Sequence, residues 1–206
     1  MENVVRDGLR YAVLVIVSCF MASTVLAESS AELPHSVVAQ ATGQVLSVVE
    51  NKGALLERDP EAFYREIGTI LEPVVAFDYI AYGVMGSFAK QASAAQRRRF
   101  SEVFQTSMIT TYAKGMAVYA NQEIEIVPPE QDYSEQRKAS VVQKLRGDGS
   151  VHTVVYSMGK SKRDNQWKLL NVIIDGVNLG TTFRAQFAQA MKKHADIDQV
   201  IANWSA

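Results

Sequence analysis

A strongly apolar stretch, WKLLNVII, occupies residues 167–174 of the chain. Lys168 and Asn171 are its only polar residues, so it is more apolar than a strand with one face in water needs to be. A strand of this kind must be covered on both faces. Because the chain has only 206 residues, a bound ligand is a candidate for one of the two covering layers.

The residues that follow this strand predict a turn and two closing helices. Asp175 and Gly176 are a turn signal, and Gly180 allows a sharp exit toward a helix. We expect Thr181 or Thr182 to cap that helix, which spans residues 182–194. A last short helix is expected over residues 196–204.

Apolar residues in the first half recur at helical spacing and predict four helices. Their expected ranges are residues 34–57, 60–72, 77–84 and 94–121. Asp59 before Pro60 is typical of a helix start, and Ser93 with Gln96 forms a capping box at the start of the longest helix. One face of that helix carries Phe100, Phe104, Met108 and Tyr112. This stripe fits either a filled core or the wall of a cavity.

The second half alternates between apolar and polar residues and predicts strands. The expected strands are residues 123–126, 138–146, 151–158 and 167–174, and Gly147 and Gly149 indicate a hairpin between the second and third. Helices followed by strands with short turns favour an α+β fold whose sheet is an antiparallel four-stranded meander. Helices packed on one face of a curved sheet would form a cone with an apolar interior.

The N-terminus predicts a cleaved secretory signal peptide over residues 1–27. Arg6 and Arg10 precede an apolar run over residues 11–20, and small residues at Val25 and Ala27 fit a cleavage site. A lipoprotein signal ending at Cys19 and a retained anchor are the alternatives. Residues 28–206 then form a single domain, and it has no disulfide because Cys19 is the only cysteine.

Composition and motifs argue against several classes of function. The formal net charge of −1 gives no electrostatic reason to expect nucleic acid as a partner. The sequence contains no nucleophile elbow, phosphate-binding loop or dinucleotide fingerprint. His35, His152 and His194 lack the spacing of metal ligands. We therefore expect no catalytic centre, no metal site and no cofactor.

Asp175 is the one carboxylate worth weighing as a general base. At the end of a buried strand its pKa would be raised, and Tyr112 or Tyr156 would then donate to an oxyanion. The competing interpretation is that Asp175 bonds backbone amides in its turn. We favour the turn.

Two basic runs invite a binding interpretation. Arg97, Arg98 and Arg99 follow one another on a helix, where successive residues point about 100° apart, so they do not all face one ligand. Lys160 and Lys162, with Arg163 beside them, fall in a turn. A solvated surface is the default for both runs, with contact to an acidic partner or a lipid phosphate as the alternative.

Taken together, several motifs resemble the MlaC family, the toluene-tolerance auxiliary proteins of ABC-type lipid transport in Gram-negative bacteria. They cover nearly the whole of residues 28–206. The motifs are Trp167-Lys-Leu, Asp175-Gly-Val-Asn-Leu179, Phe183-Arg-x-Gln-Phe187, Phe77-Asp-Tyr79 with Gly83, Gln96-Arg-Arg-Arg-Phe100 with Phe104, and Thr111-Tyr-Ala113. At Asn171 the chain departs from the Asp that we expect in the family.

The resemblance implies a periplasmic carrier that binds glycerophospholipids as cargo and works as a monomer. Such proteins exchange lipid with an inner-membrane ABC transporter complex and an outer-membrane lipoprotein–porin complex, and so maintain outer-membrane lipid asymmetry. The implied fold is similar to the cystatin-like cone, with acyl chains held between helices and sheet.

On this hypothesis, apolar residues of the helices and strands line the lipid pocket. The expected wall residues are Phe77, Ile80, Phe104, Met108, Tyr112, Val141, Val154, Tyr156, Leu170, Val172 and Ile174. Arg184 is expected to serve the fold rather than the ligand. Two rival hypotheses remain: an isomerase or dehydratase of the same cone fold that uses Asp175 with a tyrosine, and a structural adaptor with a solid core.

Overall fold

A computed structural model describes residues 33–119, 122–147 and 149–205. All of these belong to one compact unit, residues 31–206. The predicted signal peptide, residues 1–27, lies outside the described residues. Within the described part of the chain, no helix has the length and apolar character needed to cross a membrane.

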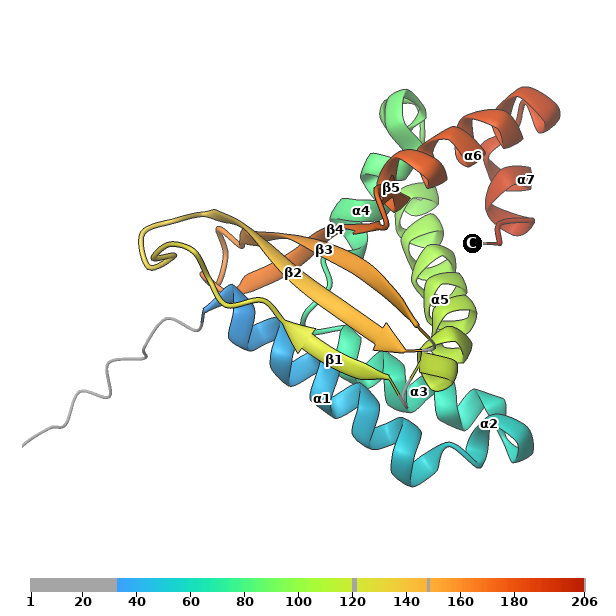
Figure 1. Cartoon of the computed structure of the whole chain (residues 1–206). Coiled ribbons are helices and arrows are strands. Elements are labelled where there is room, and N and C mark those ends of the chain that lie inside the picture. Colours follow the sequence, from blue (N-terminus) through green and yellow to red (C-terminus); the bar gives the residue numbers. More distant parts are fainter. Residues whose placement is uncertain (1–32, 120–121, 148, 206) are drawn as a thin grey trace, which may run out of the picture. The chain divides into compact units, whose positions relative to one another are not determined.

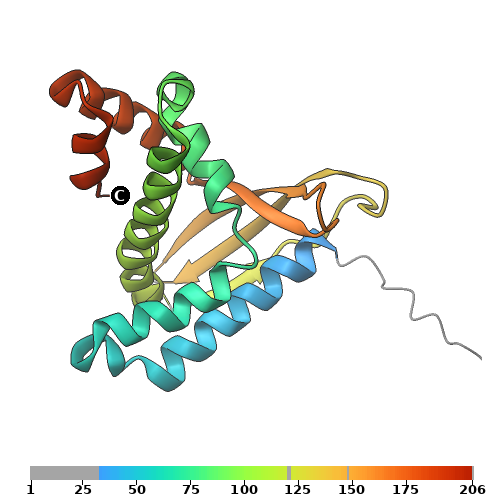
Figure 2. The ribbon, with the colours of Figure 1, turned by 180° about the vertical axis from the view of Figure 1, so that it is seen from behind.

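The unit is α+β, with seven α-helices and a five-stranded antiparallel sheet among the described residues. The helices are α1 (Pro34–Lys52), α2 (Leu55–Arg58), α3 (Pro60–Leu71), α4 (Phe77–Met85), α5 (Ala94–Tyr119), α6 (Leu179–His194) and α7 (Ile197–Ala202), with a 3-10 helix η1 (Gly86–Lys90). The strands are β1 (Glu123–Ile126), β2 (Lys138–Gly147), β3 (Ser150–Lys160), β4 (Trp167–Ile174) and β5 (Val177–Asn178), in that order across the sheet. Figure 1 shows α1 running along the sheet, and Figure 2 shows the same arrangement from behind.

The helix starts follow the local chemistry of the sequence. Asp59 accepts a hydrogen bond from the backbone N–H of Ala62 and begins α3, as predicted. The predicted capping box begins α5: the Gln96 N–H donates to Ser93 Oγ at 3.1 Å, and the Ser93 N–H donates to Gln96 Oε1 at 2.9 Å. These side chains satisfy amides that a helix start otherwise leaves without partners.

Two expectations about the helices were wrong. The helix predicted over residues 34–57 breaks after Lys52, because at Gly53 the chain turns so tightly that a Cβ would lie 2.5 Å from the carbonyl oxygen of Val49. The cap of α6 is Asn178 rather than a threonine: its Oδ1 accepts from the Thr181 N–H at 3.1 Å. The threonine hydroxyls at 181 and 182 instead donate to the Asn178 carbonyl.

Four of the five strands were predicted, and β4 has the predicted bounds. The fifth, β5, has two residues and pairs with the end of β4 through the Asp175–Gly176 turn. Both turn residues have positive φ, 48° for Asp175 and 83° for Gly176, as a tight hairpin requires. A strand this short has no alternation to detect, so the sequence pattern alone does not reveal it.

A β-bulge in β4 determines which of its side chains share a face. Ser157 pairs with Asn171 but Met158 pairs with Leu169, so Leu170 is an extra residue between the two pairs. Its side chain lies over Gly159, where a Cβ would meet Leu170 Cδ1 at 2.6 Å. Leu170 therefore lies on the opposite face of the sheet from Leu169.

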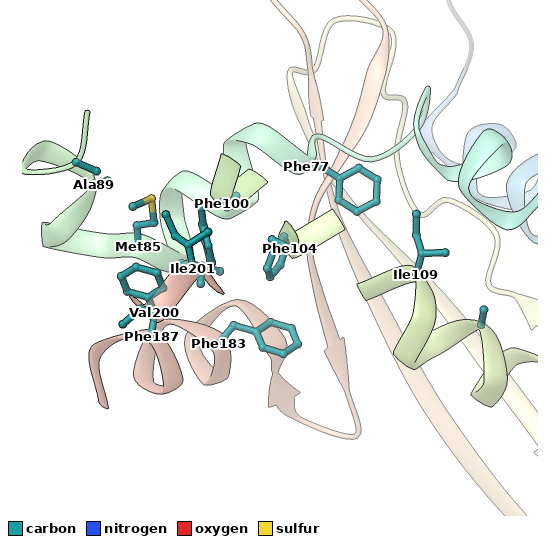
Figure 3. Packing of buried hydrophobic residues seen from close by; sticks show 14 of the residues in the cluster. Phe77, Met85, Ala89, Phe100, Phe104, Ile109, Phe183, Phe187, Val200 and Ile201 are labelled. Atoms are coloured by element: carbon teal, nitrogen blue, oxygen red, sulfur yellow. The ribbon is translucent and has the colours of Figure 1, made fainter. Parts of the chain in front are cut away.

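The core of the unit has two separate parts. The first, here called the helical cluster, draws its buried residues from the helices and the η1–α5 connection: Val45, Phe63, Ile67, Phe77, Ala81, Val84, Met85, Ala89, Ala92, Phe100, Phe104, Ile109, Ala113, Phe183, Phe187, Val200 and Ile201. Several of its aromatic rings meet edge to face, with the Phe100 and Phe187 centroids 4.9 Å apart and those of Phe100 and Trp204 5.2 Å apart. Figure 3 shows the rings contributed by α5 and α6.

The second part, the sheet cluster, joins the start of α1 to one face of the sheet. Its buried residues are Val37, Val38, Tyr133, Ala139, Val141, Met158 and Trp167. The face of the sheet that carries Val141 and Met158 is here called the inner face.

The capping box yields a first prediction. Ser93→Ala removes the cap of α5 and should lower the free energy of unfolding by about 1 kcal/mol, measured by urea denaturation. Ser87→Ala, at an exposed serine in η1, is the matched control and should change stability little. Equal effects of the two substitutions would contradict the role given to Ser93.

Candidate functional site

The inner face of the sheet brings together five of the predicted wall residues. Val141, Tyr156 and Val172 form one row across β2, β3 and β4. In the next row, Val154 pairs with Ile174. Residues paired across antiparallel strands point to the same side, and so do residues two apart on one strand. All five side chains therefore share one face.

The other predicted wall residues have different surroundings. Phe77 and Phe104 are buried within the helical cluster, and Ile80, Met108 and Tyr112 pack against that cluster. Leu170 does not join the inner face, because the bulge turns it to the opposite side. The structure thus brings together the strand residues in one group and the helix residues in another.

Part of the inner face belongs to neither core cluster. Among the described residues, Val141 and Tyr156 take part in the sheet cluster, but Val154, Val172 and Ile174 are members of neither cluster and are packed against neither. Val154 is buried, while Val172 and Ile174 are half-buried. The inner face therefore continues as an apolar surface beyond the point where the N-terminal part of α1 packs on it.

A small polar group lies on this same face. Gln143 occupies the row of Val154 and is only 5% exposed. Its Oε1 accepts from Tyr156 OH at 3.2 Å and from Thr42 Oγ1 of α1 at 3.3 Å. Burial raises the pKa of Tyr156 to about 12. Tyr156 is therefore a neutral hydrogen-bond donor at any physiological pH.

Sequence reasoning missed Thr42 and Gln143. Gln143 interrupts an otherwise apolar face of β2, and a polar residue at such a position looks like a residue exposed to solvent. Thr42 falls within a helix of mixed composition. Only the β2–β3 register and the packing of α1 bring the two residues together with Tyr156.

Two surface depressions lie elsewhere, around the C-terminal residues. A groove of about 460 Å³ is lined by Glu102, Val103, Thr106, Ser107, Thr110, Thr111, Trp204 and Ser205. A smaller depression of about 200 Å³ is lined by Gln186, Ala190, His194, Val200, Asn203, Trp204 and Ser205. No predicted wall residue lines either depression.

Asp175 has the surroundings of a turn residue. It is exposed, its Oδ1 accepts from the Thr153 N–H at 2.8 Å, and its Oδ2 lies 2.8 Å from His152 Nδ1. The hydrogen bond from the Thr153 amide, followed by the one to His152, lowers the pKa of Asp175 below its ordinary value. A general base would need the opposite shift.

Ser150 extends this group but does not complete a nucleophilic site. His152 Nε2 lies 3.3 Å from Ser150 Oγ, so Asp175, His152 and Ser150 follow one another as in a catalytic triad. The Ser150 hydroxyl, however, donates its proton to the Gly147 carbonyl at 2.9 Å. Within the described part of the chain, no three His, Cys, Asp or Glu side chains form a group able to hold a metal ion.

The three arginines of the first basic run contact other residues of the fold. Arg97 donates to the carbonyls of Ala89 and Ala92, Arg98 lies 4.0 Å from Glu102, and Arg99 pairs with Asp198 at 3.2 Å. The three guanidinium groups thus diverge, as the helical spacing predicted.

Arg184 and Lys160 also make contacts within the fold. Arg184 Nε donates to the Gly83 carbonyl at 2.7 Å and joins α6 to α4. Lys160 Nζ donates to the Ser134 carbonyl at 2.7 Å and lies 5.4 Å from the ring centroid of Trp167.

Comparisons with known proteins agree on one family. The profile of the MlaC protein family matches residues 39–206. The toluene tolerance protein ttg2D of Pseudomonas putida is 34% identical over 208 residues, which cover 100% of this chain and 91% of that protein. MlaC of Haemophilus influenzae, the binding protein of an intermembrane phospholipid transport system, is 25% identical over 167 residues, covering 80% of this chain and 76% of its own.

A solved structure has the same fold. The phospholipid-binding protein from Ralstonia solanacearum, determined in complex with a phospholipid, superposes with a TM-score of 0.74 at 22% identity, over 83% of this chain and 94% of its own. At this identity the likeness concerns the fold alone. The profile match over most of the chain and the Pseudomonas relative show that this chain belongs to the MlaC family.

Proposed function

We propose that this protein is a periplasmic phospholipid carrier that buries the acyl chains of glycerophospholipids against the inner face of its sheet. The observation that carries the proposal is the divided core: the half-buried Val172 and Ile174 and the buried Val154 form an apolar region that belongs to neither cluster. Relatives named for phospholipid transport and phospholipid binding support it.

The energetics of lipid transfer explain why an apolar surface suits this task. A diacyl phospholipid has roughly 30 methylenes, and each costs about 0.8 kcal/mol to expose to water. A lipid that crosses an aqueous compartment therefore needs a protein that covers nearly all of its chains. The five inner-face wall residues carry no charge, which would be costly beside an acyl chain.

The carrier works between two membrane partners on this proposal. We infer that it exchanges lipid with an inner-membrane ABC transporter complex and an outer-membrane lipoprotein–porin complex, and so maintains outer-membrane lipid asymmetry. It acts as a monomer in the periplasm after cleavage of residues 1–27. Bound phospholipid is cargo, and the task requires neither a cofactor nor a catalytic step.

Lipid extraction tests the proposal directly. The mature protein, purified from cells, should release phospholipid in a stoichiometric amount when it is extracted with organic solvent and analysed by mass spectrometry. Protein that carries no phospholipid, even after incubation with liposomes, would contradict it.

A bulky side chain on the inner face should block loading. Val172→Trp fills space beside Val154 and Ile174, and because overpacking typically costs 1–3 kcal/mol, bound phospholipid should fall by about fivefold or more. Val151→Trp is the matched control, since Val151 is an exposed valine of β3 on the other face of the sheet. Both variants should keep the far-UV spectrum of the parent. Equal lipid content in the two variants would exclude the inner face as the binding surface.

The proposal that Asp175 is structural predicts how stability depends on pH. The pKa of Asp175 is lowered from the ordinary value of 3.8. Its contribution to the stability of the folded state is therefore present above pH 3.8 and is lost as the pH falls through the lower folded-state pKa. Asp175→Ala should therefore lower Tm at pH 7, and the difference from the parent should shrink below pH 3.8. A difference that grows in acid would indicate a raised pKa, as a general base requires.

A further inference from the structure

The polar group formed by Thr42, Gln143 and Tyr156 lies between the two core clusters. On α1, Val38 belongs to the sheet cluster and Val45 to the helical cluster. Thr42 follows Val38 by four residues and precedes Val45 by three, so all three lie on the same side of the helix. The polar group thus interrupts the apolar surface where one cluster ends and the other begins.

The same transition occurs on the sheet. Gln143 follows Val141 by two residues on β2 and shares its face, but Val141 is in the sheet cluster and Val154, the partner of Gln143, is in neither. Gln143 is therefore the first inner-face residue of β2 beyond the packed region. It stands at the border of the apolar surface proposed to receive acyl chains.

Only one of the two polar atoms of the Gln143 side chain has hydrogen-bond partners among the described residues. Its Oε1 accepts two hydrogen bonds, from Thr42 and Tyr156, but its Nε2 has two N–H donors and no acceptor among the described residues. Nε2 keeps some accessible surface although the residue is 95% buried. An N–H donor in this position is open to an acceptor supplied from outside the protein, either water or a ligand.

We propose that Thr42, Gln143 and Tyr156 form an ester-binding subsite, in which Gln143 Nε2 donates to a carbonyl oxygen of an acyl ester. This rests on the proposed function, that a lipid occupies the inner face. The two hydroxyls hold the amide with its nitrogen toward the lipid, so Thr42 and Tyr156 act as positioning residues. A carbonyl is the one strong acceptor at the head of each acyl chain, so this contact fixes how deeply the chains enter.

The subsite predicts a preference between two lipids that differ only in the linkage. A dialkyl ether phospholipid has the same headgroup and chain length as its diacyl counterpart but no carbonyl oxygen. Loss of one hydrogen bond worth about 1 kcal/mol corresponds to about a fivefold preference for the diacyl lipid.

The experiment uses liposomes with equal amounts of diacyl and dialkyl phosphatidylcholine of matched chain length. The mature protein is incubated with them, separated, extracted and analysed by mass spectrometry. The parent should take up the diacyl lipid in about fivefold excess. Gln143→Leu should carry both lipids in the liposome ratio, and Gln136→Leu, the same change at an exposed glutamine, should behave as the parent.

Two further variants guard against a folding defect in Gln143→Leu. Tyr156→Phe and Thr42→Val keep nearly the same shape and remove one hydroxyl each, and each should reduce the preference to about twofold. Equal uptake of both lipids by the parent, or a full preference retained by Gln143→Leu, overturns the subsite and leaves the carrier intact. Uptake of neither lipid by the parent overturns the carrier and the subsite with it.

Discussion

The antiparallel register between β2 and β3 determines which side chains of these strands lie on the inner face of the sheet. Ten paired positions, from Lys138 opposite Gly159 to Gly147 opposite Ser150, place Val141 beside Tyr156 and Gln143 beside Val154. A slip of one residue would turn all of these side chains to the other face. The packing of α1, the position of the polar group and the apolar surface beyond it all depend on this register.

A protein that must admit a lipid needs apolar surface that its own core does not fill. Most domains of this size bury their apolar faces against one continuous core. Here the aromatic rings of α5 and α6 pack with one another and with Trp204, and the start of α1 packs on the sheet, so the buried apolar residues fall into two clusters.

Local chemistry explains what the sequence predicted correctly. Each of three correct predictions depends on residues that are close together in the sequence: the cap at Asp59, the cap at Ser93 and the apolar run of β4. Each formed the expected element. The resemblance to the MlaC family rests on short motifs that follow one another along the chain, and the family profile confirms it.

The errors concern features set by distant partners. The displacement of Leu170 comes from its pairing with β3, and the burial of Gln143 comes from contacts with α1. A single sequence carries no local signal for these contacts, whereas the register and the packing specify them once the sheet has formed.

Photo-crosslinking offers the most direct test of the claim that acyl chains lie against the inner face. A phospholipid with a diazirine at the end of one acyl chain is loaded into the protein and activated, and the labelled peptides are identified by mass spectrometry. The account predicts labels on β3 and β4, at Val154, Val172 or Ile174. Labels confined to the groove that Glu102, Thr106 and Trp204 line would contradict it.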